Sequence, residues 1–243
     1  MSNGVHQKYC DIAVWLARQV LDSSSVYLRG SSALRQGQRF PPWDIDIVLV
    51  TESTALPLRD AAKLAARATR ACDSQIPVDL LVVRKLDLLT NDKQVHTRML
   101  LCHESVLLWG QDVLSDAPRH ALDSATAKKV GPELIQTAEV KLREFVSRLA
   151  SGDVCDREFE GRSKSLAKAG LRLACIESLV RYGRFVRSPD DCVQVWQASE
   201  QHSVKASASL AYQALGGVAR TDAVLLCEAV EQMRLYAQRR TES

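Results

Sequence analysis

The sequence predicts an α+β fold in which a mixed sheet with flanking helices precedes an all-helical domain. Two observations lead to this prediction. Helical and strand-like segments alternate over the first part of the chain, whereas the remainder shows helical periodicity only. The composition changes between Gly110 and Pro118. We therefore expect one domain over residues 1–115 and a second over residues 116–243.

The bulk composition is that of an ordinary globular protein. A chain of 243 residues can bury the core of one large domain or two modest ones. The formal charge of +3 is nearly balanced, so it gives no bulk argument for nucleic acid as the partner. Seven cysteines occur at irregular spacing without a CxxC pair. This pattern argues against a zinc site or a disulfide framework and predicts reduced thiols.

No targeting or membrane segment is expected. The first nine residues are polar and lack the apolar stretch of a secretion signal. No apolar run approaches the roughly 20 residues that a membrane span needs. We therefore expect a cytoplasmic protein that does not bind membranes.

The first half opens with an amphipathic helix over residues 5–21, in which Ile12, Leu16 and Val20 recur with helical period. A second helix is expected over residues 57–72, with proline at its permitted first position. Runs rich in β-branched residues predict the strands. The expected strands are 26–28, 44–50, 78–83 and 105–109.

The second half is expected to hold helices only. Glycines at residues 152, 183 and 216–217 mark the joints between them. The expected helices lie near residues 119–129, 132–150, 161–183, 189–202, 206–215 and 221–239.

Three carboxylates and a glycine-serine pair stand in a fixed order in the first half. Gly30-Ser31 follows the first strand, Asp44 and Asp46 open the second with one residue between them, and Asp79 lies in the third. Because side chains alternate along a strand, the first two aspartates are expected on one face. If the second and third strands pair, Asp79 can join them.

Such a cluster predicts a magnesium site. Three neighbouring carboxylates repel one another, and Mg²⁺ removes the conflict because it prefers carboxylate oxygens and substrate phosphates as ligands. A pair of ions about 4 Å apart could activate an attacking oxygen and neutralise a leaving pyrophosphate. The serine turn at a helix N-terminus would offer N–H groups and a hydroxyl to phosphate. These parts suit nucleotidyl transfer, which depends mainly on positioning and electrostatics.

Each part also has an ordinary structural explanation. A Gly-Ser pair after a strand is common, two aspartates at a strand start can be solvated, and Asp79 could pair with Arg84 or Lys85. The combination is more specific, because aspartates inside otherwise apolar strands are costly unless they are used. We therefore favour the metal site.

At these residues the sequence resembles the DNA polymerase β-like nucleotidyltransferase superfamily. The signature of that family is an apolar strand, Gly-Ser, a spacer, Asp-apolar-Asp-apolar, and a third acidic residue on a neighbouring strand. The matching segments are 26–31, 44–47 and Asp79, within residues 24–84. More loosely, the helical second half resembles that of the bacterial antibiotic nucleotidyltransferases of the aminoglycoside type.

The resemblance implies Mg²⁺-dependent transfer of a nucleoside monophosphate from an NTP, with ATP as the expected donor, to an acceptor hydroxyl with release of pyrophosphate. Asp44 and Asp46 would bind the metal. Asp79 would bind a second metal or help to deprotonate the acceptor, and Gly30 with Ser31 would contact the triphosphate. The helical domain would form the other wall of the cleft.

Two basic features are further candidates for nucleotide binding. The spacer after Ser31 is longer than usual, and Arg35 stands in it near the place where smaller family members often carry Ala-Arg-Gly. Lys164, Lys168 and Arg172 recur every four residues and share one helical face, from which they could bind the triphosphate. A solvated surface face is the alternative for this second group.

An aminoglycoside-like small molecule is the first expectation for the acceptor, and a protein or a tRNA end is the second. A non-catalytic module, such as an antitoxin-like partner or an inactive nucleotide sensor, is the rival class. The presence of all three acidic residues argues against it. The general base stays open among Glu104, Glu133 and Glu139, as do the base of the NTP and the oligomeric state, with a homo-oligomer among the options. Solvated arginines are expected at the C-terminus.

Overall fold

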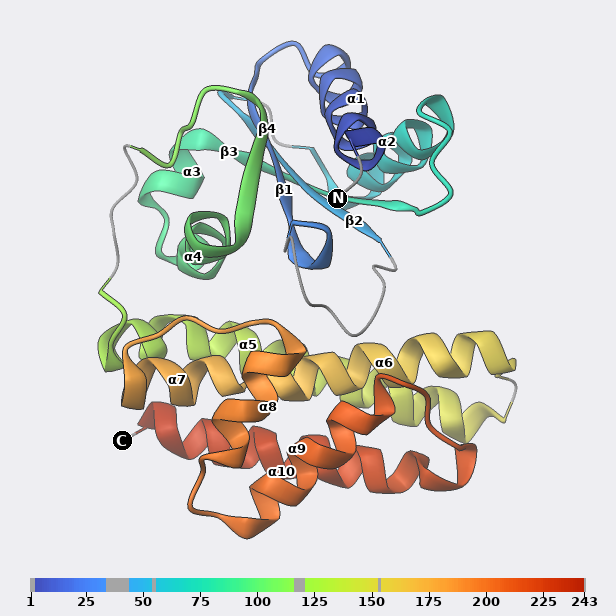
Figure 1. Ribbon diagram of the computed structural model, residues 1–243, viewed down its shortest axis with the longest axis vertical. Coiled ribbons are helices and arrows are strands. Elements are labelled where there is room, and N and C mark those ends of the chain that lie inside the picture. Colours follow the sequence, from blue (N-terminus) through green and yellow to red (C-terminus); the bar gives the residue numbers. More distant parts are fainter. Residues whose placement is uncertain (1–2, 34–43, 54–55, 116–120, 153, 243) are drawn as a thin grey trace. The chain divides into compact units, whose positions relative to one another are not determined.

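The computed structural model describes residues 3–33, 44–53, 56–115, 121–152 and 154–242 (Figure 1). The chain divides into two compact units, Met1–Arg119 and His120–Ser243. The predicted fold class is confirmed, because the first unit contains a mixed sheet with helices and the second contains helices. The predicted domain boundary after residue 115 borders residues 116–120, which lie outside the described chain, and it stays a prediction.

The described elements of the first unit follow one another in the order α1 (Asn3–Gln19), β1 (Ser23–Arg29), η1 (Gly30–Ser32), β2 (Ile45–Thr51), α2 (Leu58–Ala71), β3 (Val78–Arg84), α3 (Lys85–Thr90), η2 (Asp92–Gln94), α4 (Val95–Glu104) and β4 (Ser105–Gly110). Those of the second unit are α5 (Ser124–Ser151), α6 (Asp156–Arg172), α7 (Ala174–Tyr182), α8 (Pro189–Gln197), α9 (His202–Ala214), η3 (Arg220–Asp222) and α10 (Ala223–Glu242).

The four expected strands are confirmed and form one sheet in the order β3-β2-β1-β4 (Figure 1). Strand β1 is antiparallel to both of its neighbours, β2 and β4, and β2 is parallel to β3. The parallel pair requires a crossover, which α2 provides, since two parallel strands cannot be joined by a tight turn. This crossover places the start of β3 beside the start of β2.

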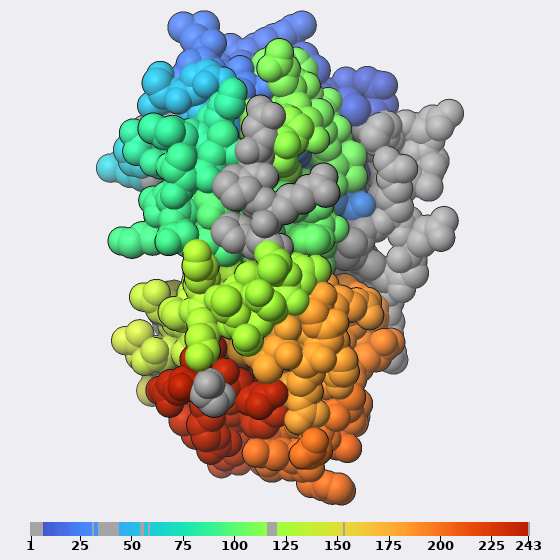
Figure 2. Space-filling model, turned by 90° about the vertical axis from the view of Figure 1, so that its left-hand side faces the viewer, coloured from blue at the N-terminus to red at the C-terminus, as the bar shows by residue number. Residues whose placement is uncertain are grey.

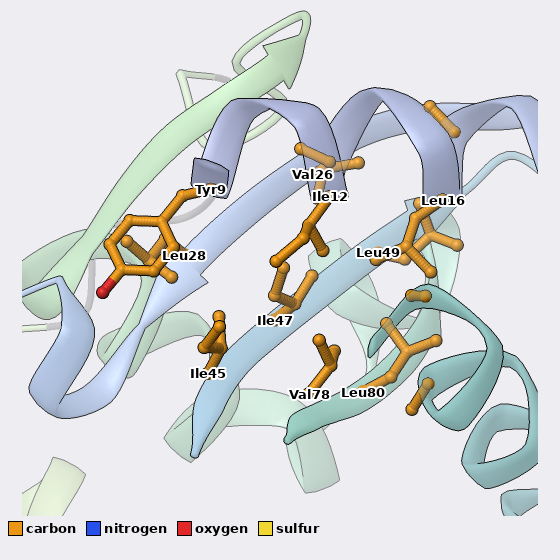
Figure 3. Packing of buried hydrophobic residues seen from close by; sticks show 14 of the residues in the cluster. Tyr9, Ile12, Leu16, Val26, Leu28, Ile45, Ile47, Leu49, Val78 and Leu80 are labelled. Atoms are coloured by element: carbon orange, nitrogen blue, oxygen red, sulfur yellow. The ribbon is translucent and has the colours of Figure 1, made fainter. Parts of the chain in front are cut away.

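Helices α1 and α2 cover one face of the sheet. Figure 3 shows Ile12 and Leu16 of α1 packed against Ile47 and Leu49 of β2, with Leu80 of β3 beside them. All of these side chains are buried. The helical period of α1 and the two-residue period of β2 therefore meet in a single core, which is what the apolar pattern of each segment predicts.

The other face of the sheet carries a smaller core. Tyr27 and Val48 pack there with Leu88 of α3 and Leu101 of α4. Neither α3 nor α4 was expected from the sequence, because each is short and the apolar pattern of α4 is only weakly amphipathic. A buried arginine joins them, since Arg98 donates to the backbone carbonyl of Leu88 at 2.6 Å.

One predicted interruption in the helical unit is wrong. The helices expected near 119–129 and 132–150 form a single helix, α5, which contains Pro132. Proline removes one N–H donor from a helix, but the apolar stripe of α5 runs through it, with Val130 and Leu134 both buried. Gly131 lies so close to α10 that an added Cβ would stand 2.4 Å from the methyl of Thr241. Tertiary packing therefore overrides the local cost of the proline.

The helix expected over 161–183 is two helices, α6 and α7, separated at Leu173. Leu173 keeps right-handed helical dihedral angles, and its N–H bonds to the carbonyl of Gly170, three residues back, at 3.3 Å. A single 3₁₀-type step of this kind tightens a helix without breaking it. The predicted joints at Gly152 and Gly183 are confirmed, and each glycine adopts a left-handed cap.

The end of α10 is not the solvated helix end that the sequence predicts. Glu177 of α7 is 1% exposed and contacts two guanidinium groups, Arg181 Nε at 2.6 Å and Arg240 Nε at 2.7 Å. Figure 2 shows the red C-terminal residues beside the yellow-green residues of α5. Arg234, which was also expected to be solvated, pairs with Glu231 at 2.7 Å. The contact between Arg240 and Glu177 joins the end of α10 to α7, whereas the pair of Arg234 and Glu231 lies within α10.

Among the described residues, none of the helices is both long and apolar enough to span a bilayer. No disulfide is found in the described part of the chain, which includes all seven cysteines. The latter agrees with the expectation of thiols without a disulfide framework.

Candidate active site

The candidate site lies where β1 ends and where β2 and β3 begin. The register of the sheet pairs Arg29 of β1 with Asp46 of β2, and Asp46 with Asp79 of β3. The three residues therefore stand in one row across three strands. They lie on the face opposite Ile45 and Ile47, because neighbouring residues of a strand point to opposite faces.

The three predicted carboxylates are brought together. One oxygen from each of Asp44, Asp46 and Asp79 lies within 4.8 Å of the other two. Asp79 is exposed, while Asp44 and Asp46 are partly buried. The competing interpretation of Asp79 fails, because Arg84 contacts Asp87 at 2.6 Å and Lys85 contacts a different carboxylate.

Two hydrogen bonds fix the starts of these elements. The Ser32 hydroxyl donates to the backbone carbonyl of Asp44 at 3.2 Å, which joins the turn after β1 to the start of β2. The Ile45 N–H donates to the Pro77 carbonyl at 2.8 Å, which joins the start of β2 to the residue before β3. The backbone around the carboxylates is thus held from both sides.

Gly30 makes the closest approach to the carboxylate cluster. Its φ of +69° lies in the left-handed region, which glycine adopts without penalty. An added Cβ would stand 2.1 Å from Oδ2 of Asp46, so no other residue fits without moving that carboxylate. Gly30 therefore lies against the carboxylate cluster, and the absence of a side chain there leaves room for the carboxylate of Asp46.

The expected helix N-terminus after Ser31 can be followed only through Ala33. Gly30–Ser32 form one turn of 3₁₀ helix, closed by a hydrogen bond from the Ala33 N–H to the Gly30 carbonyl at 3.1 Å. The residues beyond it, 34–43, lie outside the described chain. Arg35 falls among them, and the side chain of Ser31 is also outside the description. Their parts in nucleotide binding stay predictions.

The predicted lysines belong to the second unit. Lys164 and Lys168 lie on α6 and are partly buried. The ammonium of Lys164 contacts Glu160 at 2.5 Å within the same helix, and the Lys164 side chain is 13% exposed. The contribution of the two lysines to nucleotide binding stays a prediction.

The candidate general bases are also divided between the units. Glu133 and Glu139 lie on α5 of the helical unit, whereas Glu104 ends α4 in the same unit as the carboxylates. Glu104 immediately precedes Ser105, which pairs with Arg29 across β4 and β1.

Sequence reasoning missed Arg29. Its guanidinium Nη2 lies 3.2 Å from Oδ1 of Asp46, and both side chains are mostly buried, with 14% and 13% exposed. The alternation of β1 places Arg29 on the face opposite Leu28, and this was readable from the sequence. Its contact with Asp46 depends on the antiparallel register, which the sequence alone does not give.

This architecture is an α+β fold that the chain shares with a nucleotidyltransferase of known structure. No family model and no curated protein matches the sequence. Among solved structures, the chain is similar to spectinomycin adenyltransferase AAD(9) from Enterococcus faecialis, whose crystal structure contains ATP and spectinomycin. The TM-score is 0.58 and the alignment covers 95% of this chain and 98% of that one. At 11% identity the likeness is one of fold.

Proposed function

We propose that this protein is a Mg²⁺-dependent nucleotidyltransferase that moves AMP from ATP to a hydroxyl of a small molecule. One observation carries the proposal. The oxygens of Asp44, Asp46 and Asp79 lie within 4.8 Å of one another. Gly30 lies beside them, at a distance from Asp46 that a residue with a side chain could not adopt. The similarity in fold to an adenyltransferase whose structure contains ATP supports it.

The carboxylates fit a magnesium ion in chemistry and nearly in spacing. Mg²⁺ binds oxygen at about 2.0–2.1 Å, so two opposite ligands of one ion stand roughly 4 Å apart. The three carboxylate oxygens lie within 4.8 Å of one another, so side-chain rotation could bring them onto one ion. Asp44, Asp46 and Asp79 would hold the metal, which would neutralise the charge of the triphosphate and of the leaving pyrophosphate.

In the proposed reaction an acceptor hydroxyl oxygen attacks the α-phosphorus of ATP. A new oxygen–phosphorus bond forms, the bond between the α-phosphorus and the bridging oxygen breaks, and pyrophosphate leaves with the electron pair. The proton of the hydroxyl passes to a carboxylate oxygen, for which the exposed Asp79 is our candidate. Gly30 and Ser31 would position the phosphates, since such reactions depend on alignment and electrostatics.

The helical unit would complete the site. We propose that residues 116–243 form the second wall of a cleft and that Lys164 and Lys168 bind the triphosphate from it, with Arg35 contributing from the segment after the turn. Cations of this kind bind phosphate oxygens by charge-assisted hydrogen bonds. Because ATP is the proposed donor, we place the enzyme in the cytoplasm.

Transfer of label from [α-³²P]ATP tests the proposal. The protein is incubated with Mg²⁺ and with separate panels of aminoglycosides including spectinomycin, tRNA and other nucleic acids, and proteins. We expect label on a small molecule. Label on tRNA or protein would instead assign the alternative acceptor, and Mg²⁺-dependent ATP binding without transfer would identify a binding module.

Two variants make the assay specific. Asp46→Asn removes one charge from the row of carboxylates and should lower transfer by at least about 10²-fold, since charge-stabilising groups contribute on this scale. Asp60→Asn is the matched control, because Asp60 lies on α2 and pairs at 3.2 Å with Lys63 on the surface. Transfer that survives in Asp46→Asn at the control level would refute the site.

A further inference from the structure

Arg29 introduces a fixed positive charge among the three carboxylates. It is the last residue of β1 and stands opposite Asp46 in the sheet. Its Nη2 lies 3.2 Å from Oδ1 of Asp46. An arginine keeps its charge at every accessible pH, so this cation is present whether or not a metal ion is bound.

The contact between Arg29 and Asp46 is not built as a strong structural ion pair. Arginine and carboxylate pairs that stabilise a fold are frequently bidentate, with two parallel hydrogen bonds. Here one nitrogen approaches one oxygen at 3.2 Å, and the buried Nε has no hydrogen-bond partner among the described residues. The second oxygen of Asp46 faces Gly30. The guanidinium therefore lies beside the charge of Asp46, while its Nε makes no hydrogen bond to the described residues.

The charges of the cluster show what this cation does to a metal ion. Three carboxylates carry a charge of −3, and Arg29 reduces this to −2. A divalent ion that binds Asp46 must approach the guanidinium and share its carboxylate. Repulsion between a unit charge and a divalent ion over a few ångströms of water-like medium changes a binding constant on the order of tenfold.

We propose that Arg29 competes with the divalent ion for Asp46. Without nucleotide, Arg29 holds the carboxylate in place and keeps ion binding weak. When the nucleoside triphosphate arrives, its negative charge offsets the guanidinium and the ion binds more tightly. Arg29 is thus a positioning residue that couples metal binding to nucleotide binding. This inference rests on the proposed function, because it takes the carboxylates as the metal site.

The test is a titration with Mn²⁺ in the absence of nucleotide. The electron paramagnetic resonance signal of the free ion measures how much Mn²⁺ is bound. We expect Arg29→Met to bind Mn²⁺ about tenfold more tightly than the wild type. Arg29→Lys keeps the charge and should behave as the wild type does. In a second titration, ATP should raise the Mn²⁺ affinity of Arg29→Met by a smaller factor than it raises that of the wild type. The same coupling should appear in ATP affinity, since coupling between two ligands is reciprocal.

The control is Arg84→Met, which changes the net charge by the same amount. Arg84 ends β3, five residues beyond Asp79, and contacts Asp87 instead. At about 3.3 Å per residue it is roughly 17 Å from the carboxylates along the strand, where salt screens its charge. Mn²⁺ affinity in this variant should match that of the wild type.

The possible results separate the two proposals. Loss of Mn²⁺ binding in Asp46→Asn would show that the wild type binds the ion through Asp46. If Arg29→Met then binds Mn²⁺ no more tightly than the wild type, the role of Arg29 is refuted while the metal site stands. If neither the wild type nor Arg29→Met binds Mn²⁺, both proposals are wrong. Circular dichroism checks that each variant is folded, and Arg29→Gln replaces Arg29→Met if the latter is not.

Discussion

Replacing Gly30 with alanine tests the link between the backbone turn and the position of Asp46. The added Cβ would stand 2.1 Å from Oδ2 of Asp46. Real Cβ atoms essentially never approach closer than 3.0 Å, so the carboxylate must retreat by roughly 1 Å, and a displacement of this size can lower activity about 10²-fold. The left-handed φ of +69° adds strain of about 1–2 kcal/mol for any residue with a Cβ.

Gly152→Ala provides a matched control for this substitution. Gly152 has a φ of +70°, and an added Cβ would meet nothing within 4 Å. It therefore carries the same backbone strain without the collision. We expect both variants to lose about 1–2 kcal/mol of stability in urea unfolding from the left-handed backbone. Only Gly30→Ala should also lose Mn²⁺ affinity and nucleotidyl transfer.

One result would refute this role of Gly30. If Gly30→Ala binds Mn²⁺ and transfers label as Gly152→Ala does, the carboxylate of Asp46 can move without consequence. The close approach of Gly30 would then have no role in the chemistry.

Two further predictions concern the stability of the units. Glu177→Gln should lower the free energy of unfolding by about 3 kcal/mol, because it leaves two guanidinium groups beside a buried uncharged amide. The control is Glu144→Gln, which alters an exposed ion pair and should lower the free energy of unfolding by less than about 1 kcal/mol. Tyr27→Phe should cost about 1–3 kcal/mol in urea unfolding, because the hydroxyl donates to Asp112 at 2.9 Å and accepts from the Val113 N–H at 3.0 Å. Burial is the main cause that raises the pKa of Tyr27 above its usual value, and the hydrogen bond to Asp112 is the second. The folded state thus retains a proton that the unfolded chain releases near pH 10, so this stabilisation should be present below pH 10 and decline above it. The difference between wild type and Tyr27→Phe should accordingly narrow between pH 9 and pH 11, and a constant difference would contradict the assignment.

The carboxylates were predictable because their signal is local. Alternation placed Asp44 and Asp46 on one face, and the polar Asp79 inside an apolar strand pointed to use rather than to packing. The pairing of β2 with β3 was a condition of that prediction, and the structure meets it. Arg29 was missed because its meaning depends on which residue stands opposite it, and register is a property of two strands together.

The helical unit shows the same division between local and tertiary information. The glycine joints at Gly152 and Gly183 were predictable from the chain, because a left-handed cap requires a residue without a side chain. Pro132 suggested a break that does not occur, since buried neighbours carry the helix through it. The burial of Glu177 was equally hidden, because one of its two arginine partners, Arg240, comes from another helix, α10.

The row formed by Arg29, Asp46 and Asp79 depends on the same strand register as the apolar core. A slip of β2 by one residue would turn Asp46 into the apolar core beneath α1 and α2 and would turn Ile45 and Ile47 to the opposite face of the sheet. Such a misaligned sheet would lose both the core beneath α1 and α2 and the row formed by Arg29, Asp46 and Asp79. The register that buries this core is therefore the same register that brings Arg29, Asp46 and Asp79 together.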